Sequence, residues 1–173
     1  MTTWTAPEAH RTSEPRTGDE RAMLQGWLDW HRQTLLRKCA GLTAEQLRTA
    51  SVEPSNLTLL GLVRHMTEVE RGWFRRRAGG QSELRDVYCT PDNLDGDFDD
   101  VATADAEANL VTFNEELKLA DAAVAHLPLE SEHEGRDGPN SLRWVYHHMI
   151  EEYARHNGHA DLLRERLDGT TGD

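Results

Sequence analysis

Apolar residues recur along the chain at intervals of three and four, which is the period of helices that bury one face. Four stretches keep this period and predict helices over about residues 18–41, 57–77, 103–127 and 141–167. Thr43 lies three residues before Gln46, the spacing of a capping box, and predicts a short helical turn after the first helix. Ser141 is a favourable N-cap for the last helix, and Gly41 suits the end of the first.

The segments between and around these helices are less regular. Residues 81–102 lack a clean period, and a connection of this length usually crosses an end of a domain or covers a site. Its five aspartates between residues 92 and 100 do not have the spacing of a calcium loop, so we expect them to be solvated. Residues 1–17, rich in Thr, Pro, Glu and Arg, predict a flexible or loosely docked arm, and 169–173 a short tail.

Together these elements predict an all-α domain over residues 18–168. Four long amphipathic helices with one long crossover connection between the second and third describe a four-helix bundle. The length of 173 residues suits one compact domain.

The composition limits the classes of partner and compartment. A formal net charge of −12 argues against nucleic acid and anionic membranes, which need clustered Lys and Arg. No apolar run approaches the roughly 20 residues that span a bilayer. Because the two cysteines, Cys39 and Cys89, have no CxxC neighbour, a reduced, cytoplasmic protein is expected.

Polar residues interrupt two of the predicted apolar faces. On the last helix, Glu152 and His156 fall within the series Leu142, Val145, Met149, Tyr153, Ala160, Leu163 and Leu167, and they share a face because they are four apart. On the second helix, His65 lies between Leu62 and Val69 on the apolar face. Two imidazoles and one carboxylate from two helices could hold zinc and leave a position for water or substrate, and Fe(II) or Ni(II) could use the same donors.

A second interpretation of these residues stays open. A histidine on an apolar face is often only a hydrogen-bonded core residue, and a Glu–His pair four apart is a common surface salt bridge. Other histidines are alternative ligands or could orient the ligands, namely His31, His147, His148 and His159. Of these, His159 is the strongest rival, because it lies three residues after His156.

Two segments resemble a known superfamily. "LTLLGLVRHMTEVERGWF" and "SLRWVYHHMIEEYARHNGHADLLRERLDG" are similar to the DinB/YfiT-like metalloenzymes, in the branch of mycothiol-producing bacteria that includes the N-terminal domain of maleylpyruvate isomerase. The resemblance implies a four-helix bundle, often dimeric, with a metal held by one residue of the second helix and two of the last. "HNGH" at 156–159 occupies the family's HRGQ position, which implies His65, Glu152 and His156 as the ligands.

The resemblance also implies an activity. We expect a divalent-metal-dependent S-transferase or isomerase, with zinc as the metal and a low-molecular-weight thiol, mycothiol in particular, as co-substrate of a small electrophile. A metal-dependent hydrolase and a non-catalytic metal-binding or dimerisation bundle are the alternatives. A homodimer is expected as well, because Trp27, Trp30 and Trp73 are more large aromatic residues than one bundle interior holds.

Overall fold

The computed structural model describes residues 3–135 and 138–172, and it is mostly helical. Within these residues the long elements are α1 (Glu20–Cys39), α3 (Leu59–Glu70), α5 (Ala106–Val124) and α6 (Leu142–Asp168), with the short helices α2 (Ala44–Leu47) and α4 (Gly96–Asp99) between them. A π-helical segment, η1 (Arg71–Ala78), continues α3 without a break. The four predicted helices are therefore present, with ends shifted by up to three residues.

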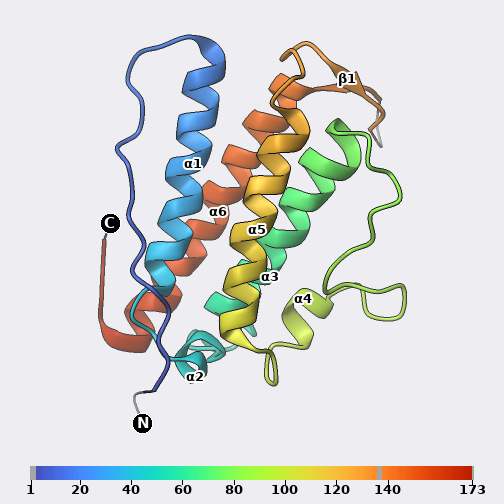
Figure 1. Ribbon diagram of the computed structural model, residues 1–173. Helices are drawn as coiled ribbons and strands as arrows, with labels where there is room; N and C mark the ends of the chain where they lie inside the picture. The colour runs from blue at the N-terminus through green and yellow to red at the C-terminus, as the bar shows by residue number, and fades with distance from the viewer. Residues whose placement is uncertain (1–2, 136–137, 173) are drawn as a thin grey trace.

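The long elements lie side by side (Figure 1). In this view α1 and α6 run in the same direction, and α3 with η1 and α5 run the opposite way. Residues 81–105 carry the chain back from the end of η1 to the start of α5, as expected for one long crossover connection. The core lies between these helices and consists mainly of leucines with Phe74, Phe113, Tyr146 and Tyr153.

Caps set several helix ends as the sequence predicts. Ser141 accepts a hydrogen bond from the Trp144 amide at the start of α6, and Gly169 follows the helix in the left-handed conformation, with φ 78°. Thr43 and Gln46 form both hydrogen bonds of the capping box at α2. These local signals are strong because each one satisfies backbone groups that the helix end leaves unpaired.

The predicted secondary structure needs two corrections. The expectation of an all-α fold is wrong in detail, because β1 (Glu132–His133) pairs antiparallel with β2 (Asn140–Ser141) just before α6. The second helix, predicted over about residues 57–77, changes from α-helical to π-helical hydrogen bonding at Arg71. A π segment inserts an extra residue per turn, and the spacing of apolar residues does not reveal it.

The N-terminal arm makes defined contacts along α1. Ala6 is buried and exchanges backbone hydrogen bonds with Gly41 and Leu42. Further along, the Thr12 amide donates to Gln33 Oε1 at 2.7 Å. These contacts come from single residues without a period, so the sequence pattern contains no signal for them.

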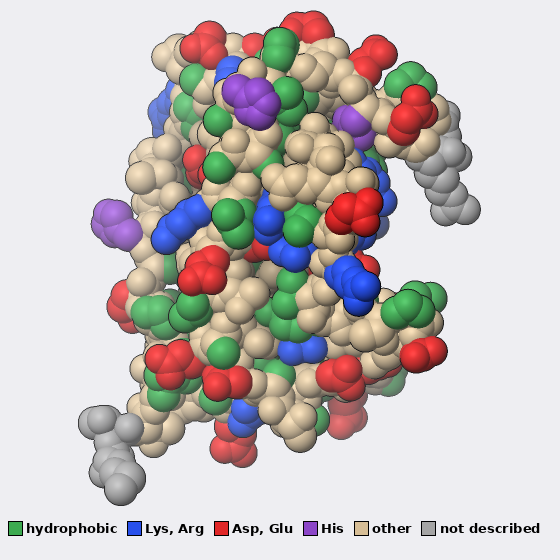
Figure 2. All heavy atoms as spheres, turned by 45° about the vertical axis from the view of Figure 1, so that its right-hand side comes forward, with side chains coloured by type: hydrophobic (Ala, Val, Ile, Leu, Met, Phe, Trp, Pro, Cys, Tyr) green, Lys and Arg blue, Asp and Glu red, His purple; other side chains and the backbone are tan. Residues whose placement is uncertain are grey.

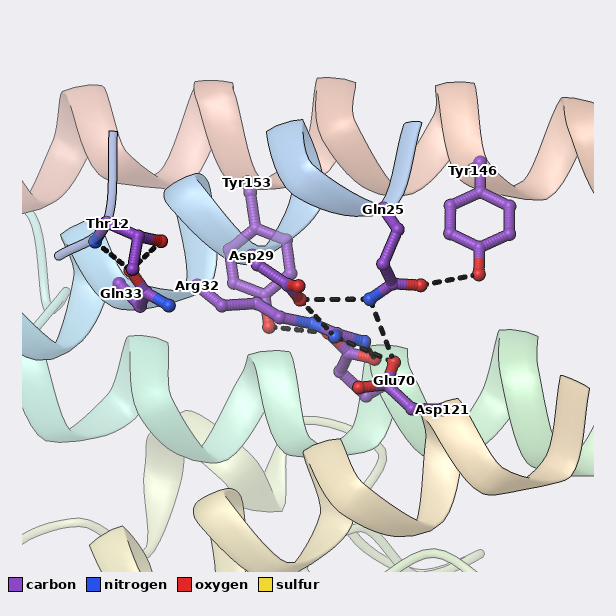
Figure 3. Close-up of polar contacts among 9 residues, drawn as sticks. All are labelled: Thr12, Gln25, Asp29, Arg32, Gln33, Glu70, Asp121, Tyr146 and Tyr153. Atoms are coloured by element: carbon purple, nitrogen blue, oxygen red, sulfur yellow. Dashed lines mark hydrogen bonds and ion pairs between the residues drawn. The ribbon is translucent and has the colours of Figure 1, made fainter. Parts of the chain in front are cut away.

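A polar network crosses the core between α1, α3, α5 and α6 (Figure 3). Arg32 donates to both carboxylate oxygens of Glu70 at 2.7 Å, and Glu70 Oε1 also accepts from the Tyr153 hydroxyl at 2.8 Å. Arg32 reaches Asp121 on α5 as well, at 2.8 Å. Since Arg32 and Glu70 are both buried, their pairing is needed to offset the loss of hydration, and it ties the end of α3 to α1.

Candidate functional site

Three residues from two helices meet at the edge of the core. His65 lies on α3, and Glu152 and His156 lie one turn apart on α6. One ligand atom of each lies within 4.8 Å of those of the other two, and Glu152 Oε2 is 3.5 Å from His156 Nε2. The side chains of His65, Glu152 and His156 are 27%, 24% and 13% exposed, respectively. The group is therefore half-buried, whereas its place in the apolar series had suggested a fully buried position.

His65 is held in place by an aspartate from the long connection. Asp97 on α4 places Oδ2 2.8 Å from His65 Nδ1, and its side chain is 7% exposed. With Nδ1 used in this way, Nε2 is the nitrogen left for a ligand. The expectation that all five aspartates of this connection are solvated is therefore wrong for Asp97.

The connection is fastened to α3 in the helical turn that precedes His65. Arg64 donates to the carbonyl oxygens of Gly96 and Asp97, at 2.8 and 2.9 Å, and to Asn109 on α5. At Gly61, a Cβ atom would come within 2.9 Å of the Phe98 ring, so glycine allows α4 to approach. The long connection thus contributes part of the site.

His156 is suited to bind a metal at neutral pH. Burial, followed by the charges of the neighbouring His65, His159 and Arg155, lowers its pKa to about 4. The imidazole is consequently neutral at pH 7, which leaves a nitrogen lone pair free to coordinate.

The alternative histidines lie beside this group or apart from it. His159 Nδ1 is 3.4 Å from His156 Nδ1, and His148 Nε2 is 3.5 Å from Glu152 Oε1. His148 belongs to a second group with Glu151 and Glu152, in which Glu151 is exposed and ion-paired with Arg155. His31 lies on α1, against Asn157 and away from the three-residue group.

The donor set fits a divalent metal. Two ligand atoms 2.0–2.1 Å from a tetrahedral zinc lie about 3.4 Å apart, which is close to the 3.5 Å between Glu152 and His156. Two imidazoles and one carboxylate are donors that catalytic zinc sites and non-haem iron sites both use. Together with the hydrogen bond from Asp97 to His65, the residues present suit such an ion.

A cleft of about 650 Å³ opens beside His65, between α3, η1 and the connection; its lining includes His65, Trp73, Arg76, Cys89, Asp97 and Phe98. Glu68 holds the outer wall, because its Oε1 accepts hydrogen bonds from the backbone amides of Val87 and Cys89. On the face of the molecule drawn in Figure 2, Lys and Arg side chains lie among Asp and Glu rather than in a field of one sign.

Cys89 in this cleft is a weak nucleophile. Burial raises the pKa of its thiol to about 11, and the charges of Asp97 and Glu68 act in the same direction. Since the thiolate is the reactive form, Cys89 is not a candidate nucleophile at neutral pH.

Two residues, Asp97 and Trp144, lie beside the candidate metal ligands or on the same helix face but were not identified from the sequence. Asp97 is 32 residues from His65 in a segment without a period, and no sequence signal connects them. Trp144 could have been found, because it precedes His148, Glu152 and His156 at intervals of four on one face of α6.

Comparison with known proteins gives one match. The family model described as mycothiol-S-transferase matches residues 23–169, which is most of the chain. Neither the curated proteins nor the solved structures contain a significant match. None of the described helices is long and apolar enough to cross a membrane.

Proposed function

Because the chain belongs to the mycothiol-S-transferase family, within the DinB-like superfamily, we propose that it is a divalent-metal-dependent S-transferase. Its co-substrate is a low-molecular-weight thiol of the mycothiol type, and its second substrate is a small electrophile. The observation that carries this proposal is the half-buried group of His65, Glu152 and His156 beside a cleft wide enough for a small molecule.

These three residues would hold the metal, for which zinc is the first choice and nickel or iron the alternatives. When bound, a zinc ion lowers the pKa of a coordinating thiol, so that thiolate is available at neutral pH. Glu152 adds one negative charge to two neutral imidazoles. This charge lowers the Lewis acidity of the centre below that of three histidines and favours a more nucleophilic sulfur.

The protein's own residues position the reactants. Asp97 fixes the ring of His65, and the connection that carries Asp97 forms the outer wall of the cleft. In the reaction, a bond forms between the thiol sulfur and an electrophilic carbon. In a substitution, the bond from that carbon to its leaving group breaks, chloride being released from monochlorobimane, and the thiol proton passes to solvent. In an addition to an activated double bond there is no leaving group, and the proton passes to the carbon next to the new bond.

The proposal extends to the architecture and the assembly. We interpret α1, α3 with η1, α5 and α6 as the four-helix bundle of the superfamily. A homodimer is proposed through the face of α1 that carries Trp27 and Trp30, whose ring centroids are 5.9 Å apart and whose side chains are only partly buried. Light scattering that gives the mass of one chain, 19.6 kDa, at tens of micromolar would contradict this assembly.

A conjugation assay tests the activity. Protein stripped of metal by a chelator is reloaded with Zn²⁺, Ni²⁺ or Fe²⁺ and supplied with monochlorobimane and either mycothiol, bacillithiol or glutathione. We expect metal-dependent turnover that is fastest with mycothiol and abolished by His156→Ala. His147→Ala is the matched control, because His147 is an exposed histidine on the same helix and should leave turnover unchanged.

Either of two experimental outcomes would contradict the transferase function and favour one of the alternative functions. Ester or amide hydrolysis that needs metal but no thiol would favour a hydrolase. Stoichiometric metal without turnover for any thiol would favour a non-catalytic metal-binding bundle.

A further inference from the structure

A row of side chains four residues apart runs along α6 through the candidate metal group. Trp144, His148, Glu152 and His156 follow one another at this interval, so they lie on one face of the helix. Each contacts the next toward the C-terminus: His148 stacks on Trp144 at 4.9 Å, and Glu152 lies 3.5 Å from His148 and from His156. The row therefore connects the metal group to a tryptophan two helical turns away.

A second row faces it from α3 and η1. His65 and Trp73 are both on this face, and both line the cleft. The ring centroid of His65 lies 4.8 Å from that of His156, and the centroid of Trp73 lies 4.6 Å from that of His148 and 5.3 Å from that of Trp144. The two helices thus hold imidazoles at one end of a shared face and indoles at the other.

We call Trp73, His148 and Trp144 the aromatic shelf. Trp144 is 43% exposed, whereas His148 and Trp73, which its ring contacts, are partly buried. The ring of His148 is nearly parallel to that of Trp144, at 12°, and Trp73 meets both at steeper angles. Contacts of this kind keep the rings in place, so the shelf is preorganised rather than loose.

Arg77 packs against Trp73, one of the three residues of the shelf. Its guanidinium lies 4.4 Å from the centroid of the Trp73 ring, in a cation–π contact. The neighbouring Arg76 is paired with Asp86, whereas Arg77 forms no ion pair with any residue of the described ranges. Arg77 therefore holds Trp73 through its ring and covers one side of it.

The position of the shelf indicates what it binds. Eight residues of α6 separate Trp144 from Glu152, which corresponds to about 12 Å along the helix, within the length of a small molecule. His65 and Trp73 both line this cleft, so one ligand in it can contact the metal group and the Trp73 side of the shelf, against which His148 and Trp144 pack. A flat indole surface favours a flat aromatic ring over a saturated ring of equal size.

We propose that the aromatic shelf binds an aromatic ring of the electrophile, so that the preferred second substrates carry an aryl group about 12 Å or less from their reactive carbon. This inference rests on the proposed transferase function. It assigns Trp73 and Trp144 as residues that determine specificity, separate from the residues that would hold the metal.

Binding of unreactive probes tests the shelf without any catalysis. Ethyl phenyl sulfone and cyclohexyl ethyl sulfone have no electrophilic carbon and differ only in the ring. For the wild type, calorimetry should give a Kd for the phenyl probe about 2- to 10-fold below that for the cyclohexyl probe, the factor an aromatic pair contributes. Trp144→Leu should remove this preference, and Trp144→Phe should keep most of it.

The matched control is Leu119→Ala on α5. Leu119 is exposed to a similar extent as Trp144, at 47%, but it belongs to α5, whereas the shelf is formed by residues of η1 and α6, so its variant should keep the wild-type preference. Equal affinity of the wild type for the two probes would overturn the proposal. So would an unchanged preference in Trp144→Leu.

A kinetic comparison separates this inference from the proposed function. Phenyl and cyclohexyl vinyl sulfone react by one step: the thiolate sulfur adds to the terminal carbon of the double bond, and the carbon next to the sulfone takes up a proton. An aryl preference in both kcat/KM and Kd supports the shelf. Selective phenyl binding without turnover of any electrophile supports the shelf and refutes the transferase, while turnover without an aryl preference refutes the shelf alone.

A second copy of the chain is the competing occupant of the shelf. If Trp144→Leu converts a dimer to a monomer in light scattering and the ring preference is unchanged, the shelf is a subunit interface and the proposal is wrong.

Discussion

Asp97 Oδ2 lies 2.8 Å from Nδ1 of His65, although the two residues are 32 positions apart and belong to different elements. The carboxylate is buried, and it belongs to the connection that forms the outer wall of the cleft. Through this one contact, the segment that covers the site also sets the orientation of a candidate ligand.

Replacing this carboxylate should weaken metal binding without removing a ligand. In Asp97→Asn the fixed ring orientation and the added basicity of His65 are lost, so the affinity for Zn²⁺ should fall about 10- to 100-fold. Competition with a chromophoric chelator measures the change. Asp99→Asn is the control, since Asp99 is an exposed aspartate of the same short helix, and equal losses in both variants would exclude an orienting role.

The buried ion pair should dominate stability. Glu70→Gln leaves Arg32 without its bidentate partner inside the core and should lower the free energy of unfolding by about 3–5 kcal/mol. Tyr153→Phe removes one hydrogen bond to a charged group and should cost about 1.5–3 kcal/mol.

Urea unfolding followed by circular dichroism measures both changes. Glu20→Gln serves as the control, because Glu20 pairs with Arg143 on the surface, where solvent screens the interaction and little change is expected. A midpoint for Glu70→Gln equal to that of the wild type would contradict the importance of the network.

Cys89 should behave as an unreactive thiol despite its place in the cleft. With a pKa of about 11, roughly one thiol in a thousand is ionised at pH 8, so alkylation by iodoacetamide should be slow and should accelerate about tenfold per pH unit up to pH 10. Cys89→Ser should therefore retain thiol conjugation. Loss of turnover in this variant, with metal content unchanged, would show that Cys89 takes part in the reaction.

The sequence predicts the helices well because their signals are local. Ser141 as N-cap, the apolar series of the last helix and the capping box at Thr43 each depend on residues within a few positions of one another. The group of His65, Glu152 and His156 could be proposed for a related reason, because a polar residue on an apolar face stands out against a regular pattern.

The features that the sequence does not reveal depend on distant contacts. Asp97 looks like the other aspartates of its segment until the fold brings it to His65. The change to a π-helix at Arg71 leaves no mark on the spacing of apolar residues, and Glu132 pairs with Ser141, nine residues later, in strands of only two residues each. Such features require the tertiary structure.

Changing Glu152 to histidine should keep the metal. Glu152→His provides a third imidazole at the same position on α6, which is a donor that zinc accepts. The centre should then be a stronger Lewis acid, so that the bound water or thiol titrates at lower pH than in the wild type. A pH profile of conjugation that does not move to lower pH, with full metal content, would contradict the electrostatic role assigned to Glu152.

The most direct test of the account is calorimetric titration of the metal-free protein with Zn²⁺, for the wild type, Glu152→Gln and Glu151→Gln. The two variants remove the same charge from adjacent positions, but only Glu152 belongs to the group with His65 and His156, while Glu151 is exposed and paired with Arg155. We predict one equivalent of zinc per wild-type chain, an affinity at least about tenfold lower for Glu152→Gln, and no change for Glu151→Gln. Equal affinity of the wild type and Glu152→Gln would contradict the proposed metal centre.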